Sequence, residues 1–131
     1  MADFEELLDE CDLLPSDIAP AAKAIAYYAA SVSGNVWTKD QSGKWRPTAE
    51  NFVTIKPQWK QAKSLAVTLR GEPAEFEASS SLDIKKDQNG YSAFRLEVAS
   101  QIADAFVAIK RAHVLFERGR TRTKTSPKTI G

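Results

Sequence analysis

The sequence is poor in the residues that hold structural metal ions or disulfides. Its 131 residues include one cysteine, Cys11, and one histidine, His113. A Cys/His zinc site needs four such ligands and an internal disulfide needs two cysteines, so neither is expected within the chain. A single thiol is consistent with a reducing compartment.

Long apolar runs and clustered glycines are also missing. There is no run of about eighteen apolar residues, and residues 1–6 are acidic where a secretory or transit peptide would be basic. The six glycines stand singly, so the glycine-rich cradles of Walker and dinucleotide-binding motifs are absent. We therefore expect a cytoplasmic protein with no membrane contact and no cofactor.

Few residues suggest catalysis. Cys11 and His113 could form a thiolate pair only if the fold brought them together, and the acidic surroundings of Cys11 disfavour a thiolate. Glu75, Glu77 and Asp83 could hold a divalent ion for hydrolysis. No catalytic signature accompanies them, and an exposed edge or loop explains them better. We assign no catalytic residue and no metal site, and we expect a protein without enzymatic activity.

What is present is an ordinary globular composition with an uneven charge. Hydrophobic residues make up 43% and charged residues 27%, which predicts one folded domain, placed at residues 1–118. The net charge is +1, but residues 1–17 carry seven acidic and no basic side chains, whereas residues 118–131 carry five basic and no acidic ones. Residues 119–131 are predicted to form a basic, disordered tail. Alternatively, this tail is an arm that meets phosphate or the acidic N-terminus of a second copy.

Local patterns predict an α+β fold. Apolar residues at helical spacing predict helices at residues 4–11, at residues 16–34 with Ser16 or Asp17 as the cap, and at residues 100–118 with Gly119 as the stop. Branched and aromatic runs predict strands at residues 36–39, 44–46, 52–56, 65–69 and 91–98. The result is two N-terminal helices, an antiparallel sheet of about four to five strands and a C-terminal helix packed on one face.

Two hairpins are predicted in this sheet. Strands 36–39 and 44–46 form the first, and Pro47 confines the second of them to a sheet edge. In the second hairpin, a two-residue turn at Asn89-Gly90 would split the apolar faces. A three-residue loop ending at Gly90 instead sets Ile84 opposite Phe94, and this bulged register requires a left-handed Gly90.

One surface carries a binding hypothesis. Residues 37–70 hold seven basic and two acidic side chains together with all three tryptophans, and single-stranded nucleic acid requires such a mixture of charge and rings. The loop of residues 56–63 would present one tryptophan beside three lysines. The candidate binding residues, two of them from the tail, are Trp45, Arg46, Lys56, Trp59, Lys60, Lys63, Arg120 and Arg122.

Other interpretations of the same residues stay open. Tryptophans in a small domain usually pack inside it, and the sequence pI of about 7.8 lies below the basic range of dedicated nucleic-acid domains. Tryptophan and arginine also anchor protein interfaces. We expect a small non-catalytic binding or accessory module that contacts a protein partner or a second copy, with binding of single-stranded nucleic acid as the alternative.

Three strand-like segments, Phe52–Pro57, Leu65–Leu69 and Tyr91–Leu96, lead into the last predicted helix. Over residues 50–118 this order resembles a small bacterial domain of unknown function that was once labelled a predicted transport protein. That domain is found alone or fused to nuclease-like parts of restriction and defence proteins. The resemblance implies an accessory module near nucleic-acid enzymes and supplies no catalytic residues. The acidic first helix and the long connection at residues 72–81 differ from its pattern.

Overall fold

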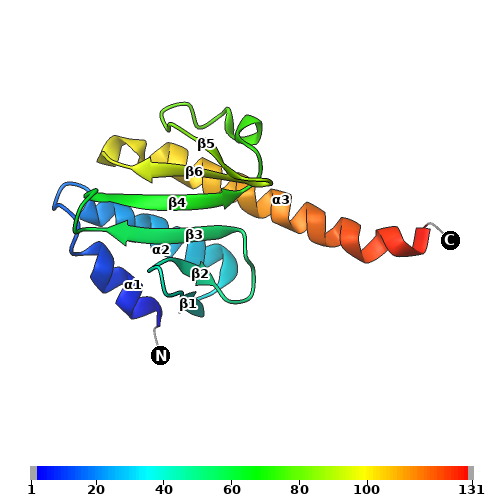
Figure 1. Ribbon diagram of the computed structural model, residues 1–131, viewed down its shortest axis with the longest axis horizontal. Coiled ribbons are helices and arrows are strands. Elements are labelled where there is room, and N and C mark those ends of the chain that lie inside the picture. The colour runs from blue at the N-terminus through cyan, green and yellow to red at the C-terminus, as the bar shows by residue number, and fades with distance from the viewer. Residues whose placement is uncertain (1–2, 130–131) are drawn as a thin grey trace.

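The described part of the chain forms an α+β fold, as predicted, with a sheet of six strands. The computed structural model describes residues 3–129, with side chains as far as Gly119. The helices are α1 (Phe4–Cys11), α2 (Ala19–Ser33) and α3 (Ile102–Thr129), and the 3-10 helices are η1 (Pro73–Phe76) and η2 (Ala99–Gln101). The strands are β1 (Trp37–Lys39), β2 (Trp45–Pro47), β3 (Val53–Gln58), β4 (Ser64–Arg70), β5 (Lys85–Gln88) and β6 (Tyr91–Leu96). The antiparallel sheet has the order β1-β2-β3-β4-β6-β5 (Figure 1).

The two N-terminal helices begin in different ways. The Asp3 carboxylate caps α1 by accepting a hydrogen bond from a first-turn backbone N–H at 3.2 Å. Helix α2 begins at Ala19 without the cap predicted at Ser16 or Asp17. Pro20 in its first turn needs no partner for a backbone N–H and already has a helical φ, so the helix starts without a side-chain cap.

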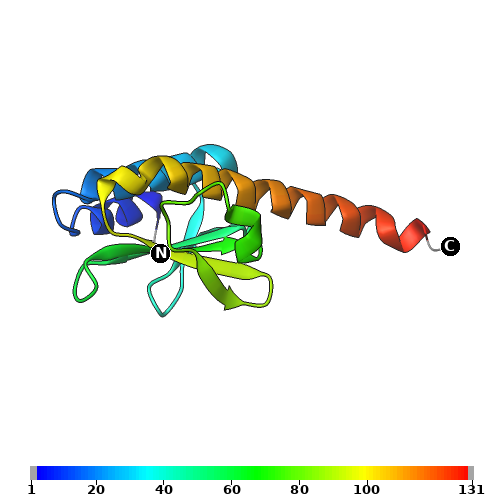
Figure 2. The ribbon, with the colours of Figure 1, turned by 90° about the horizontal axis from the view of Figure 1, so that it is seen from above.

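Alternating side chains give the sheet one buried face and one open face. In β3, Val53 and Ile55 are buried, and Ile55 lies opposite Val67, which lies opposite Phe94. Helices α1, α2 and α3 all cover this apolar side (Figure 2). None of the described helices covers the other side, which we call the open face.

Strand β2 lies inside the sheet, which corrects its predicted position at an edge. It pairs with β1 as predicted, and Trp37 lies opposite Pro47. Its ladder with β3 consists of the single pair Trp45 and Ile55. Pro47 lies beyond that pair, so its missing backbone N–H removes no hydrogen bond to β3.

The β5–β6 hairpin keeps the predicted register with a different turn. Lys85 lies opposite Ala93, which is the alignment that the apolar pattern predicts. Ile84, which was predicted to lie opposite Phe94, comes one residue before the ladder begins. The extra residue lies within β5, where the register shifts just after Lys86, instead of in a three-residue loop. Gly90 has a φ of 86°, so its predicted left-handed conformation is confirmed.

Helix α3 continues past Gly119, where we expected it to end. Gly119 does not have a positive φ, so it does not adopt the left-handed conformation that stops a helix. One glycine inside a helix costs only about 1 kcal/mol, and basic residues near a helix C-terminus favour the helix dipole. The last turns extend beyond the sheet (Figures 1 and 2). Neither α3 nor any other described helix is long and apolar enough to cross a membrane.

Candidate nucleic-acid interface

Two neighbouring hollows border the open face, and the first also reaches Glu10 of α1. The first, which we call the hairpin cleft, has a volume of about 440 Å³ and lies between the β1–β2 turn and the β3–β4 hairpin. The second, which we call the sheet hollow, has a volume of about 670 Å³ and lies over the open face. Both are lined by Lys56, Gln58 and Arg95, so the two hollows adjoin, and we call them together the concave surface.

Trp59 forms part of the wall of the hairpin cleft. Its ring is half-buried and packs against the core, and the ammonium group of Lys60 lies 6.0 Å from its ring centroid. Lys56 lines the same cleft, as predicted from the loop sequence. Lys63 is exposed at the end of the hairpin turn, where it has a φ of 54°, and it is not among the lining residues. The structure therefore brings Lys56, Trp59 and Lys60 together.

Two cationic side chains flank an alanine on the open face. Lys56 lies opposite Ala66 on the neighbouring strand, and Ala66 lies opposite Arg95 on the next. Because paired strands lie about 4.8 Å apart, Lys56 and Arg95 begin roughly 10 Å from each other with a methyl group between them. Neither cation forms an ion pair within the described residues. Their long side chains can close on an anion such as a phosphate above Ala66. Arg95 was not among the predicted site residues.

Lys56, Ala66 and Arg95 form a line across three strands, which we call the cation row. Two buried polar atoms without hydrogen-bond partners lie beside it. Gln58 borders both hollows and is opposite Ser64 at the base of the β3–β4 hairpin. The Gln58 side-chain oxygen and the Ser64 hydroxyl are buried, and neither has a hydrogen-bond partner among the described residues. An unsatisfied buried polar group costs about 1 to 3 kcal/mol. A ligand or a water molecule bound here would remove that cost.

The rim of the sheet hollow along β5 has mixed charge. Asp83 forms an ion pair with Lys85 at 3.4 Å, and Asp87 and Glu97 also line this side. The positive charge of the concave surface is therefore concentrated near the β3–β4 hairpin.

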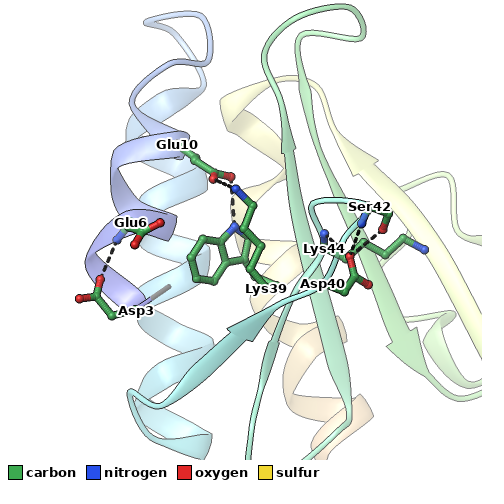
Figure 3. A network of polar contacts seen from close by, with 8 residues as sticks. Asp3, Glu6, Glu10, Lys39, Asp40, Ser42 and Lys44 are labelled. Carbon is green, nitrogen blue, oxygen red and sulfur yellow. Dashed lines mark hydrogen bonds and ion pairs between the residues drawn. The ribbon is translucent and has the colours of Figure 1, made fainter. Parts of the chain in front are cut away.

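Trp45, one of the predicted binding residues, is structural. Its side chain is 0% exposed, and its indole N–H donates a hydrogen bond to Oε1 of Glu10 at 3.1 Å. Glu10 also pairs with Lys39, whose ammonium lies 5.5 Å from the Trp45 ring centroid. Figure 3 shows Glu10 of α1 and Lys39 pointing toward each other. A fully buried ring cannot stack on a base, so Trp45 is removed from the candidate site.

Arg46 is also engaged within the protein. Its Nη2 atom lies 2.9 Å from Oδ2 of Asp40, in the β1–β2 turn. The Ser42 hydroxyl and the backbone N–H of Lys44 donate hydrogen bonds to the same carboxylate (Figure 3). These bonds, that of Ser42 foremost, lower the pKa of Asp40 to about 2. Arg46 therefore helps to fix the turn that forms one wall of the hairpin cleft.

Two of the predicted binding residues belong to the tail. The side chains of Arg120 and Arg122 lie outside the described residues, but the backbone of α3 leaves the sheet at the end opposite the β3–β4 hairpin (Figures 1 and 2). The described last turns of α3 and the β3–β4 hairpin thus lie at opposite ends of the sheet (Figure 1).

A second polar cluster lies elsewhere, where α3 packs on the connection between β2 and β3. Nε2 of His113 is 3.1 Å from Oε1 of Glu50 and 3.6 Å from Oε2 of Glu117. We did not predict this cluster. The four-residue spacing of His113 and Glu117 on a helix was visible in the sequence, but the approach of Glu50 depends on tertiary packing.

The other groups considered for chemistry have structural surroundings. Cys11 is fully buried, and burial, aided by neighbouring carboxylates, raises the pKa of its thiol to about 12, which disfavours the thiolate. His113 belongs to the cluster just described. Glu75 forms an ion pair with Arg111 of α3, and Glu77 is exposed after η1.

Comparison with known proteins adds no relative to these observations. No protein-family model, curated protein or solved structure matches this chain. The resemblance of residues 50–118 to a bacterial domain of unknown function therefore stays a prediction, and the function is argued from the geometry of the surface.

Proposed function

We propose that this chain is a binding module that holds single-stranded nucleic acid across the hairpin cleft and the sheet hollow. One observation carries the proposal: Trp59, Lys56, Lys60 and Arg95 lie along one concave surface. Single-strand binding proteins combine these two elements, since cations contact the phosphates and an aromatic ring stacks on a base.

The other groups on this surface support a flexible strand as the ligand. A base can stack on Trp59 only if it is free of its neighbours, which favours a single strand over a duplex. The unpartnered side-chain oxygen of Gln58 can accept a hydrogen bond from the edge of a base once the side chain turns outward. The hydroxyls of Thr54 and Thr68, which lie opposite each other near the cation row, can bond to phosphate or sugar.

The test is a fluorescence anisotropy titration with labelled single- and double-stranded DNA and RNA at low and physiological salt. Trp59→Ala should weaken single-strand binding by about 1 to 3 kcal/mol, or roughly 5- to 150-fold, because one stacked base is lost. Lys56→Gln and Arg95→Gln should each weaken binding and lower the salt slope by about one. The matched control is Lys110→Gln, which removes an exposed charge from α3 on the covered side of the sheet.

Two results would contradict the proposal. One is the absence of salt-sensitive binding to every nucleic acid at low salt. The other is equal loss of affinity in Lys110→Gln and Lys56→Gln, because that result would mean diffuse attraction to any positive charge on the protein.

A second candidate function is protein contact through the sheet hollow, with a second copy of the chain as the partner. It is favoured by the small side chains on the open face, Thr54, Ala66, Thr68 and Ala93, which leave the sheet accessible to a flat surface. Sedimentation at rising protein concentration tests it. Thr68→Arg should shift any dimer toward monomer, and a chain that stays monomeric at every concentration would remove this candidate.

A further inference from the structure

We propose that Glu50, His113 and Glu117 form a binding site for one divalent transition-metal ion, with Zn²⁺ as the fitting probe. The site is separate from the proposed nucleic-acid surface, because it joins the β2–β3 connection to α3 on the covered side of the sheet. It differs from the four-ligand Cys/His type that the composition excludes, since two of its three ligands are carboxylates.

The ligand atoms are already spaced for a metal ion. Zn²⁺ binds histidine nitrogen and carboxylate oxygen at about 2.0 to 2.2 Å, so ligand atoms around a tetrahedral ion lie roughly 3.3 to 3.5 Å apart. Nε2 of His113 lies 3.1 Å from the Glu50 oxygen and 3.6 Å from the Glu117 oxygen. All three atoms lie within 4.8 Å of one another. An ion would displace the hydrogen bond between Nε2 of His113 and Oε1 of Glu50, with the ring proton on Nδ1, and the glutamates would rotate to centre the ion.

The charges of the ligand set match a divalent cation. Two carboxylates supply two negative charges, and neutral imidazole is a good ligand for zinc and other late first-row metals. A carboxylate offers two oxygens, so Glu50 and Glu117 can each bind the ion through one and keep a further contact on the other. Three protein ligands leave a coordination position open for water or another ligand.

The surroundings hold the histidine ring in place before any ion arrives. Its ring centroid lies 4.8 Å from that of Phe52 in an edge-on contact and 6.3 Å from that of Phe116. The side chains of His113 and Glu50 are only 21% and 15% exposed. Ala112, next to the histidine, is fully buried, so this turn of α3 is fixed to the core. His113 and Glu50 therefore lose little side-chain freedom on binding, whereas the Glu117 side chain, 40% exposed, becomes ordered.

A bound ion would link the β2–β3 connection to α3 near the place where the helix leaves the sheet. Because the ligand set depends on the fold, binding should stabilise the folded state and raise the temperature of thermal unfolding. This effect is independent of whether the chain binds nucleic acid.

The chain has one histidine, so ring NMR signals report on His113 alone. The 131-residue chain, free of tags and labelled at histidine, is titrated with ZnCl₂ at a pH of about 7.5, where a free imidazole is mostly neutral. The ring signals should shift and saturate at one equivalent of Zn²⁺. Glu117→Gln should weaken the affinity at least about tenfold, because even the loss of a group that only orients a ligand costs about 10- to 100-fold. The matched control Glu77→Gln, which changes an exposed glutamate outside the cluster, should leave affinity unchanged.

Ring signals that stay unshifted in excess Zn²⁺ would overturn the proposal, even if the ion binds elsewhere, for example on the acidic face of α1. Glu117→Gln with unchanged affinity would also overturn it. Glu50→Gln is the second variant, and circular dichroism of both variants establishes that each is folded before the affinities are compared.

Discussion

Replacing Glu10 by alanine should destabilise the fold much more than removing an exposed carboxylate from the same helix. The Glu10 carboxylate accepts the indole N–H of Trp45 at 3.1 Å and pairs with Lys39. Alanine would leave the N–H of a fully buried ring without an acceptor. Glu10 therefore fixes α1 to the first two strands of the sheet.

The magnitude follows from these two contacts. A buried donor left without an acceptor costs about 1 to 3 kcal/mol. The ion pair with Lys39, whose side chain is 33% exposed, adds up to about 1 kcal/mol after screening by solvent. Glu10→Ala should therefore lower the free energy of unfolding by about 1 to 4 kcal/mol, out of the roughly 5 to 15 kcal/mol typical of such a domain. The variant should remain folded at room temperature.

Urea denaturation followed by circular dichroism measures this loss. Glu6→Ala is the matched control, because Glu6 is exposed on the same helix and only its backbone N–H is bonded to Asp3. In a double-mutant cycle, Glu10→Ala should cost less in a Trp45→Phe background, where the indole N–H is already gone. Equal losses in Glu10→Ala and Glu6→Ala, or no coupling in the cycle, would refute the reasoning.

Two further predictions concern a backbone position and a turn. Gly71 has a φ of 129°, and a Cβ there would lie 2.7 Å from Leu115 and 3.0 Å from Phe76. Gly71→Ala should therefore lower the free energy of unfolding, measured by urea denaturation, more than Gly34→Ala does. A Cβ at Gly34 meets open space, so that variant should lose only about 1 kcal/mol, for its positive φ. Equal losses would contradict this prediction. The pKa of Asp40 is lowered from 3.8 to about 2, so its stabilisation is present above about pH 4 and is lost as the pH falls through about 2. Asp40→Asn should reduce the fall in the urea midpoint over this range, and an unchanged pH profile would count against the assignment.

Helices and strands that follow from the spacing of nearby residues could be predicted from the sequence. The burial of individual tryptophan rings could not. The apolar spacing of Phe4, Leu7 and Leu8 defined α1 because helical period is a local property. Trp45 and Trp59 occur in similar basic surroundings in the sequence. Trp45 is buried and bonds to Glu10 of α1, which lies 35 residues away in the chain, so no local pattern could distinguish the two rings.

Helix and strand ends that depend on weak local signals were also mispredicted. A single glycine at position 119 predicts a helix end, but its cost of about 1 kcal/mol is small beside that of breaking a continuous helix. Pro47 predicted an edge strand, whereas the ladder between β2 and β3 is one pair long and leaves the proline unaffected. In both cases the preference of a single residue did not decide where the helix ended or where the strand lay in the sheet.

The cation row could not be found from sequence because it depends on which strand lies beside β4. After β4 the chain passes through η1 and β5 before β6 returns to pair with β4, so β6 separates β4 from β5. That order sets Arg95 and Lys56 on either side of Ala66. If β5 were the neighbour of β4 instead, its exposed lysines and Asp87 would border Ala66 and the row would carry both charges. The place of Arg95 beside Lys56 is therefore a property of the strand order and would be lost with the β4–β6 pairing, whereas Lys56 and Lys60 come from one continuous segment and would stay together.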